Sequence, residues 1–544
     1  MLDTFDTIAP AATGHGADSH RACIRGALGT IRANDLRPRP TLAAKLRTLA
    51  AIVGPGLIVM VGDNDAGAFA TYTQAGQDYG TSLLWTLLLL GPVLYVNQEM
   101  VLRLGAVAGV GHARLILQRF GRFWGAFSVL DLFVLNGLTI VTEFIGVSIG
   151  LDFLGLPKLW GVLAAAAATM LAAATGSFRR FERFALTLCL GSFLLVPVAF
   201  AVHPPLGVVA HDLLVPRLPA GGKLADVLLL IIAIVGTTVA PWQLFFQQSY
   251  VIDKRITPRF ISYERADLLI GIAVVLLGGV AMIAFSAATF AGHPEAGTFT
   301  DAGGVMSGLA RYVGHVPATL FAIALIDASI IGAAAVSLAS AYALGDVFSL
   351  SHSLHRPVRE ARGFYLFYAA LIAGAAILVL LPGAPLGLIT EAVQSLAGIL
   401  LPSATVFLLL LCNDRDVLGP WVNGFWTNLF TGAVIAVLVL LSIVLTVSVL
   451  YPQVTGSQIL IILGAGLVLA MVVSVPALLL RRGEAAPATE AARSRLSWRM
   501  PALETLPPAR LGRGTRIWMT VLRLYLLAAV ALVLIRVTQL ALAH

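Results

Sequence analysis

The chain has 544 residues, of which 58% are hydrophobic and 12% charged, with a formal net charge of +8 and a mean hydropathy of +0.89. These values exclude an ordinary soluble globular protein, in which about 25% of residues are charged. Apolar runs of about twenty residues, each long enough to cross a bilayer as a helix, recur along most of the chain. The sequence therefore predicts an all-α polytopic membrane protein. The net positive charge does not indicate nucleic acid as a partner, because Lys and Arg lie in the short segments between the apolar runs.

Residues 1–45 are polar and basic and lack the short apolar core and cleavage site of a secretory signal. We expect a cytoplasmic amino-terminal tail that is partly disordered. The cysteines Cys23, Cys189 and Cys412 show no metal-ligand spacing and are interpreted as packing residues.

Twelve apolar segments are predicted to span the membrane, and a thirteenth is undecided. The twelve are residues 49–75, 82–104, 126–152, 158–175, 184–202, 225–251, 267–291, 316–346, 363–382, 387–411, 422–450 and 457–480. The thirteenth, residues 516–541, contains Arg523 and Arg536, so it either spans with both arginines snorkelling or lies in the interface.

The Lys and Arg content of the loops alternates along the predicted spans. The loops after the even-numbered spans are basic, as is the segment 481–515, whereas the opposite loops are poor in both residues. Because basic loops stay in the cytoplasm, we expect a cytoplasmic amino terminus and a location in the cell (inner) membrane.

The first span is interrupted by Asp63, Asn64 and Asp65, which are followed by Ala66 and Gly67. Polar groups and broken backbone at membrane depth are tolerated only where they line a cavity or a ligand site. The run therefore predicts a cation site on an interrupted helix. A simple turn is the alternative.

A second interruption is predicted in the sixth span, where Thr237 and Thr238 precede Pro241. Proline breaks a helix because it removes a backbone donor and clashes with the preceding turn. The two interrupted spans are five spans apart and enter from opposite sides. This layout predicts two inverted five-helix halves with a site near the midplane. The corresponding domains are residues 46–202 and 203–411, followed by residues 412–480, 481–515 and 516–544.

Three stretches resemble the NRAMP divalent-metal transporters: GPGLIVMVGDNDAGAFATYTQAG in the first span, VTEFIG in the third and GTTVAPWQLFFQQS in the sixth. The resemblance extends from about Leu49 to Leu450. It implies a LeuT-like 5+5 inverted repeat with discontinuous helices 1 and 6, followed by two or three extra carboxy-terminal helices. It also implies that a divalent cation is the substrate.

The departures from the family pattern concern the metal ligands. The family motif Asp-Pro-Gly-Asn keeps its aspartate as Asp65, but its proline is Ala66 and its asparagine is Ala68; the sixth-helix methionine is Ala240, and its companion alanine is Thr237. The loss of the soft thioether favours Mg²⁺, which prefers oxygen and keeps several waters. The pattern is similar to the NRAMP-related magnesium transporters, with Mn²⁺ tolerated as a second ion. The candidate metal positions are Asp63, Asn64, Asp65, Ala66, Ala68, Thr237, Thr238 and Ala240.

The proton-handling positions of the family are also altered. The third-helix aspartate is Ile140 and the sixth-helix histidine is Trp242, whereas the third-helix glutamate is kept as Glu143. We therefore expect transport driven by the membrane potential without protons, since a divalent ion gains about 4.6 kcal/mol over 100 mV. Glu143 is either a pathway group or a structural acid, Gln394 is a further pathway candidate, and Asp327 is a buried acid with no identified partner.

Three rival functions remain open: a proton-coupled Mn²⁺/Fe²⁺ carrier, a sodium-coupled amino-acid symporter of the same architecture, and a non-transporting sensor with residues 481–515 as its output element. The sequence contains no nucleophile–base pair, phosphate loop or nucleotide motif, so we expect neither an enzyme nor a bound cofactor. The oligomeric state is open, and a monomer is compatible with the sequence.

Overall fold

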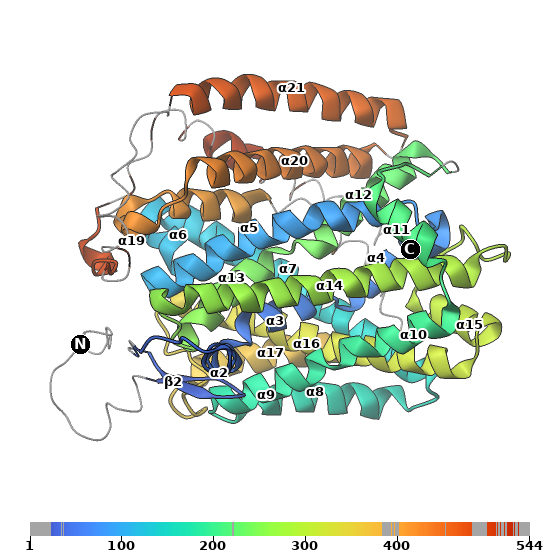
Figure 1. Cartoon of the computed structure of the whole chain (residues 1–544), viewed down its shortest axis with the longest axis horizontal. Coiled ribbons are helices and arrows are strands. Elements are labelled where there is room, and N and C mark those ends of the chain that lie inside the picture. Colours follow the sequence, from blue (N-terminus) through green and yellow to red (C-terminus); the bar gives the residue numbers. More distant parts are fainter. Residues whose placement is uncertain are drawn as a thin grey trace.

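A computed structural model describes residues 23–382 except 34, 36, 220 and 221, residues 402–480 except 452, and short stretches or single residues between 393 and 531. The described part of the chain is a helical bundle with one small hairpin beside it (Figure 1). The hairpin pairs β1 (Cys23–Arg25) with β2 (Thr30–Arg32) in antiparallel register, with Ile24 opposite Ile31. Part of the predicted disordered tail is therefore structured.

The helices divide into three groups along the chain. The first group is α2 (Leu42–Ile52), α3 (Pro55–Val61), α4 (Ala66–Tyr79), α5 (Leu84–Ala108), α6 (His112–Phe120), α7 (Arg122–Phe153), α8 (Lys158–Ala174), α9 (Phe178–Cys189), the 3₁₀ turn η1 (Gly191–Leu194), α10 (Leu195–Val202) and α11 (Leu206–Leu214). The second is α12 (Leu224–Thr238), α13 (Pro241–Asp253), η2 (Pro258–Phe260), α14 (Ile261–Phe290), α15 (Ala302–Tyr312), α16 (His315–Val347) and α17 (Arg362–Leu380). The third is α19 (Arg415–Leu418), η3 (Gly419–Trp421), α20 (Phe425–Leu450), α21 (Gly456–Leu480) and η4 (Leu503–Thr505), preceded by a helix at Pro402–Cys412.

Eight helical segments among the described residues are long and apolar enough to cross a membrane, and a ninth is counted if α2 and α3, bent by 58°, form one span. This confirms the predicted polytopic helical class. The prediction that the fifth span begins at residue 184 is wrong, because α9 already begins at Phe178. The first turns of α9 carry Arg179 and Arg183, which bind the hairpin through its backbone carbonyls instead of lying in a loop.

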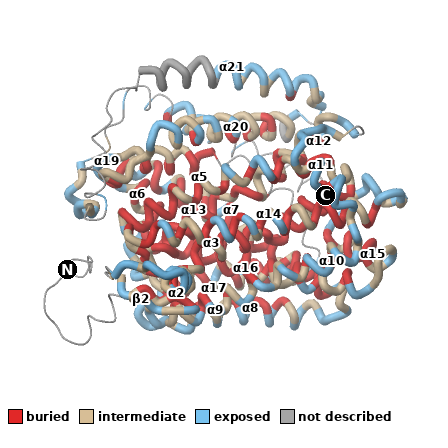
Figure 2. Tube along the Cα trace, viewed as in Figure 1, coloured by how far each residue is buried: buried red, intermediate tan, exposed pale blue. Residues whose placement is uncertain are grey.

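Both predicted interruptions are present. The first separates α3 from α4 at residues 62–65, and the second separates α12 from α13 at residues 239–240. Each interrupted helix is buried by long continuous helices, since α14 packs against α3 and α4, and α13 packs against α5 and α16. Figure 2 shows the buried residues concentrated in these central helices, whereas the described part of α21 at the edge of the bundle is largely exposed.

The packing of α3 on α14 requires a glycine. A Cβ atom added to Gly56 would lie 2.6 Å from the backbone nitrogen of Leu268. The two backbones therefore approach closely just before the first interruption, which holds residues 62–65 in the centre of the bundle.

Candidate functional site

Asp65 begins helix α4 and is part of the first interruption. Its backbone is extended, with φ −80° and ψ −175°, and its Oδ1 accepts a hydrogen bond of 2.9 Å from the Ala68 amide. An aspartate in this position satisfies one of the free amides at a helix amino terminus. Asp65 is 7% exposed, and its carboxylate keeps further lone pairs for another partner.

The three consecutive polar residues of the interruption point to three different helices. Asp63 Oδ1 accepts from Gln243 Nε2 of α13, and Asn64 Nδ2 donates to the Val275 carbonyl of α14 at 3.2 Å. Two oxygens of these side chains, Asp63 Oδ2 and Asn64 Oδ1, are buried without a hydrogen-bond partner among the described residues. Asp63, Asn64 and Asp65 therefore do not converge on one point.

Glu143 of α7 lies beside Asp65. Its Oε2 accepts from the Ala66 amide at 3.2 Å, and the two carboxyl groups interact directly. Gly332 of α16 leaves the space for this side chain, because an added Cβ would lie 2.9 Å from the Glu143 carboxyl carbon. The first interruption therefore has two neighbouring buried carboxyl groups, one from α4 and one from α7. The sequence had identified no titratable partner for Glu143.

The second interruption is tied to the first by side chains. The Thr238 hydroxyl donates to the Ile234 carbonyl at 2.6 Å and lies 2.7 Å from the Tyr72 hydroxyl of α4. Gln243, which holds Asp63, accepts in turn from Gln98 of α5 at 2.9 Å. The two breaks are therefore linked by Tyr72–Thr238 and by Asp63–Gln243.

Side-chain oxygens from both broken helices lie near Gly67. A Cβ atom added there would lie 3.2 Å from Asp65 Oδ1 and 3.7 Å from Thr237 Oγ1. Ala240 and Ala68 contribute only methyl groups as side chains at their positions. Among the described residues no group of three or more His, Cys, Asp or Glu is arranged to hold a metal.

The remaining predicted residues that the structure describes lie outside the group of polar side chains named above. Ile140 and Trp242 are buried, and the Trp242 ring lies 3.6 Å from where a Gly62 Cβ would be. Asp327 packs against Gly191 of η1, outside both interruptions. Gln394 lies outside the described residues.

Sequence reasoning missed Gln243, Gln98 and Tyr72. The available signal was a pair of amides in apolar helices, one of them two residues after Pro241.

Comparison with known proteins identifies the family. Residues 56–448 match the family described as natural resistance-associated macrophage protein-like, or Nramp. The chain belongs to the NRAMP family. A Deinococcus radiodurans protein named divalent metal cation transporter MntH is 28% identical over 417 residues, covering 73% of this chain and 89% of that protein. A protein of the same name from Verminephrobacter eiseniae is 29% identical, covering 74% and 91%.

The fold is also shared with a solved NRAMP structure. A single-residue mutant of the Eremococcus coleocola manganese transporter aligns with a TM-score of 0.60 at 18% identity, covering 82% of this chain and 97% of that one. This likeness confirms the predicted LeuT-like helical architecture. The predicted placement in the magnesium branch of the family finds no support in these comparisons.

Proposed function

We propose that this chain carries a divalent metal cation across the membrane by alternating access, with Asp65 as its side-chain carboxylate ligand. The observation that carries the proposal is that side-chain oxygens of Asp65 and Thr237, one at each interrupted helix, both lie near Gly67. Interrupted helices at the midplane supply carbonyls and helix ends to transported ions. A sensor without transport would not need two linked interruptions.

Mn²⁺ is the first candidate substrate. The relatives named above are divalent metal or manganese transporters, and Mn²⁺ accepts carboxylate, carbonyl and water oxygens. Mg²⁺ is the second candidate, favoured by the absence of a soft side-chain donor at Ala68 and Ala240. We therefore rank Mg²⁺, the ion favoured by the sequence, after Mn²⁺ as the proposed substrate.

The contact between Asp65 and Glu143 supports the release of a proton when the metal binds. A cation on Asp65 favours full ionisation of the carboxyl pair, so the proton held there leaves. The neighbouring positions Ile140 and Trp242 have no titratable group to carry it further. The carboxyl pair therefore loses one proton for each metal bound. The side chains at positions 140 and 242 cannot carry this proton further.

The membrane topology proposed here keeps the amino terminus in the cytoplasm, because Lys and Arg alternate as described. Residues 46–202 and 203–411 are proposed as the two inverted repeats, and a monomer contains both interruptions. The cell (inner) membrane is the proposed location.

The test is metal uptake into proteoliposomes with an inside-negative potential, measured separately for Mn²⁺ and Mg²⁺. We expect Asp65→Asn to reduce uptake of both ions to the level of empty vesicles. Asp152→Asn is the matched control, since Asp152 is exposed at the end of α7. Near-normal uptake by folded Asp65→Asn protein would remove Asp65 from the site.

A pH-sensitive dye in the same vesicles tests the proton. We propose that the proton lost from the Asp65–Glu143 pair leaves on the lumenal side together with the metal. Metal uptake should then acidify the lumen in the unaltered protein, and should do so less in Glu143→Gln. Uptake at full rate with no lumenal acidification in the unaltered protein would contradict proton release and support transport driven by potential alone.

A further inference from the structure

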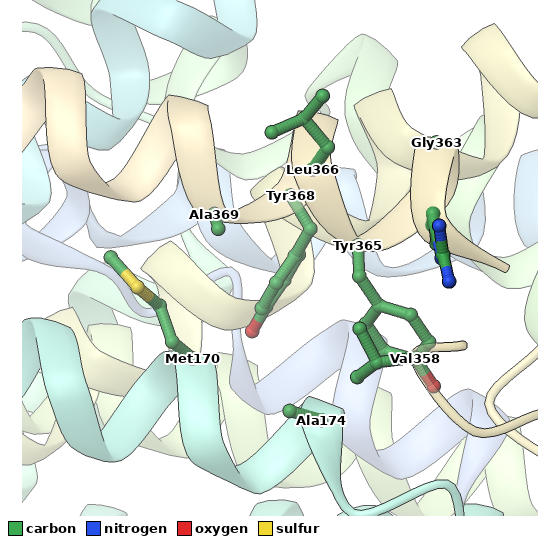
Figure 3. A pocket seen from close by; sticks show the side chains of 9 residues that line it. Met170, Ala174, Val358, Gly363, Tyr365, Leu366, Tyr368 and Ala369 are labelled. Atoms are coloured by element: carbon green, nitrogen blue, oxygen red, sulfur yellow. The ribbon is translucent and has the colours of Figure 1, made fainter.

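A cavity of about 430 Å³ lies between α8 and α17, away from the interrupted helices. It is lined by Met170, Ala174, Val358, Arg362, Gly363, Tyr365, Leu366, Tyr368 and Ala369. Figure 3 shows Tyr365 and Tyr368 projecting from α17 toward α8, where Met170 and Ala174 face them. The volume is within the range of small-molecule pockets.

Apart from Arg362, the polar side-chain atoms of the lining are already hydrogen-bonded. The Tyr368 hydroxyl donates to the Thr169 carbonyl at 3.1 Å, and the Tyr365 hydroxyl donates to the Arg356 carbonyl at 2.9 Å. Both rings are thereby held in place, and their carbon atoms line the cavity. An occupant must be a hydrocarbon chain over most of its length.

Exposed apolar side chains continue outward from the cavity on both helices. Leu366 of α17 is 68% exposed and Leu171 of α8 is 67% exposed. In a membrane-spanning bundle such residues face lipid. The cavity is therefore reached from the bilayer and not from the transport site.

The rim of the cavity is positively charged. Arg362, the first residue of α17, lines it and is exposed, and Arg359 is exposed three residues earlier. The acid Glu360 lies between them in the same loop and is also exposed. Guanidinium groups bind phosphate oxygens with paired hydrogen bonds.

We propose that this groove binds one acyl chain of an anionic phospholipid, with the headgroup phosphate against Arg362. The apolar walls contact the acyl chain, which enters from the bilayer. Arg362 at the rim favours a negatively charged headgroup. The lipid bridges α8 and α17. This inference does not depend on which metal the protein carries.

Native mass spectrometry of the delipidated full chain in detergent tests the proposal, with phosphatidylglycerol and phosphatidylcholine of the same acyl chains added separately. We expect phosphatidylglycerol to bind more tightly. Arg362→Gln should weaken it about fivefold, the effect of one basic residue near an anionic lipid, and should leave phosphatidylcholine unchanged. Arg356→Gln is the matched control, because Arg356 is exposed in the same loop but does not line the cavity.

Ala369→Phe fills the groove and should weaken both lipids, and Ala174→Leu serves the same purpose if the first variant is poorly folded. Equal binding of the two lipids, or equal effects of Arg362→Gln and Arg356→Gln, would overturn the proposal. Equal binding of glycerol phosphate without chains would indicate a free-anion site instead. Unchanged lipid binding in both groove-filling variants would show that the lipid lies elsewhere.

Discussion

Lys254 and Glu182 form a buried ion pair, with 2.6 Å between Nζ and Oε1 and no exposed surface on either side chain. Lys254 Nζ also donates to the carbonyls of Ile52 and Val53, and Glu182 Oε2 accepts from the Ala27 amide. One pair thus joins the end of α13, the start of α9, the end of α2 and the amino-terminal hairpin. It fixes the chain immediately before α3, the first half of the interrupted helix.

Removing the lysine should destabilise the protein. Lys254→Met leaves the Glu182 carboxylate buried without its cation and takes the donor from two carbonyls, and breaking a buried pair in this way costs about 3–5 kcal/mol. The measurement is the thermal unfolding temperature in detergent. Replacing both partners, as Lys254→Met with Glu182→Leu, should restore part of the loss. A single variant as stable as the parent would show that the pair contributes nothing.

The hairpin should be released by a single arginine change. Arg179 donates to the Gly26 and Gly29 carbonyls and to the Thr30 hydroxyl, so Arg179→Gln should increase amide hydrogen exchange in β1 and β2. Arg180→Gln is the matched control, since the adjacent Arg180 is exposed. Equal exchange in the two variants would mean that the hairpin is held by its other contacts.

The helical class and both interruptions could be predicted from the sequence, because apolar runs and the polar residues that break them are local signals. The hairpin could not, since the carbonyls of Gly26 and Gly29 in its turn are held by Arg179 of α9, about 150 positions away. For the same reason the start of α9 was placed too late: Arg179 resembles a loop residue until its partners are known.

The candidate site was predictable only in part. Asp65 could be identified from its place in an apolar run, but the direction of its neighbours could not. Asp63 and Asn64 point to α13 and α14 because Gln243 and the Val275 carbonyl lie there. These partners come from distant segments, so sequence spacing carries no information about them.

Protonation of His112 should be linked to stability. His112 lies in α6, outside the spans, with Nδ1 2.8 Å from Gln248 Oε1. Burial lowers the pKa of His112 to about 4, and this effect outweighs the opposing hydrogen bond to Gln248. In the unfolded chain the pKa is about 6.5. Between these values the unfolded chain binds a proton that the folded protein does not, so stability falls as the pH drops through this window.

At pH 5 the proton bound only by the unfolded chain lowers the free energy of unfolding by about 2 kcal/mol. His112→Gln should remove this loss, so the variant should lose less stability than the parent between pH 7.5 and pH 5, as measured by thermal unfolding. His315→Gln is the control, because His315 is exposed. Identical pH dependence in the parent and in His112→Gln would contradict the linkage.

Restoring softer donors should change which metal is carried. Ala68→Asn and Ala240→Met together introduce a carboxamide and a thioether at two of the positions where this chain departs from the family pattern. A thioether cannot replace the water that Mg²⁺ keeps, whereas Mn²⁺ and Fe²⁺ accept nitrogen and sulfur ligands. The ratio of Mn²⁺ to Mg²⁺ uptake in proteoliposomes should therefore rise. Ala68→Ser with Ala240→Leu is the matched control, since these changes add bulk without a soft donor. If the double variant carried Mg²⁺ better and Mn²⁺ no better, the softness of the ligands would not govern selection at this site.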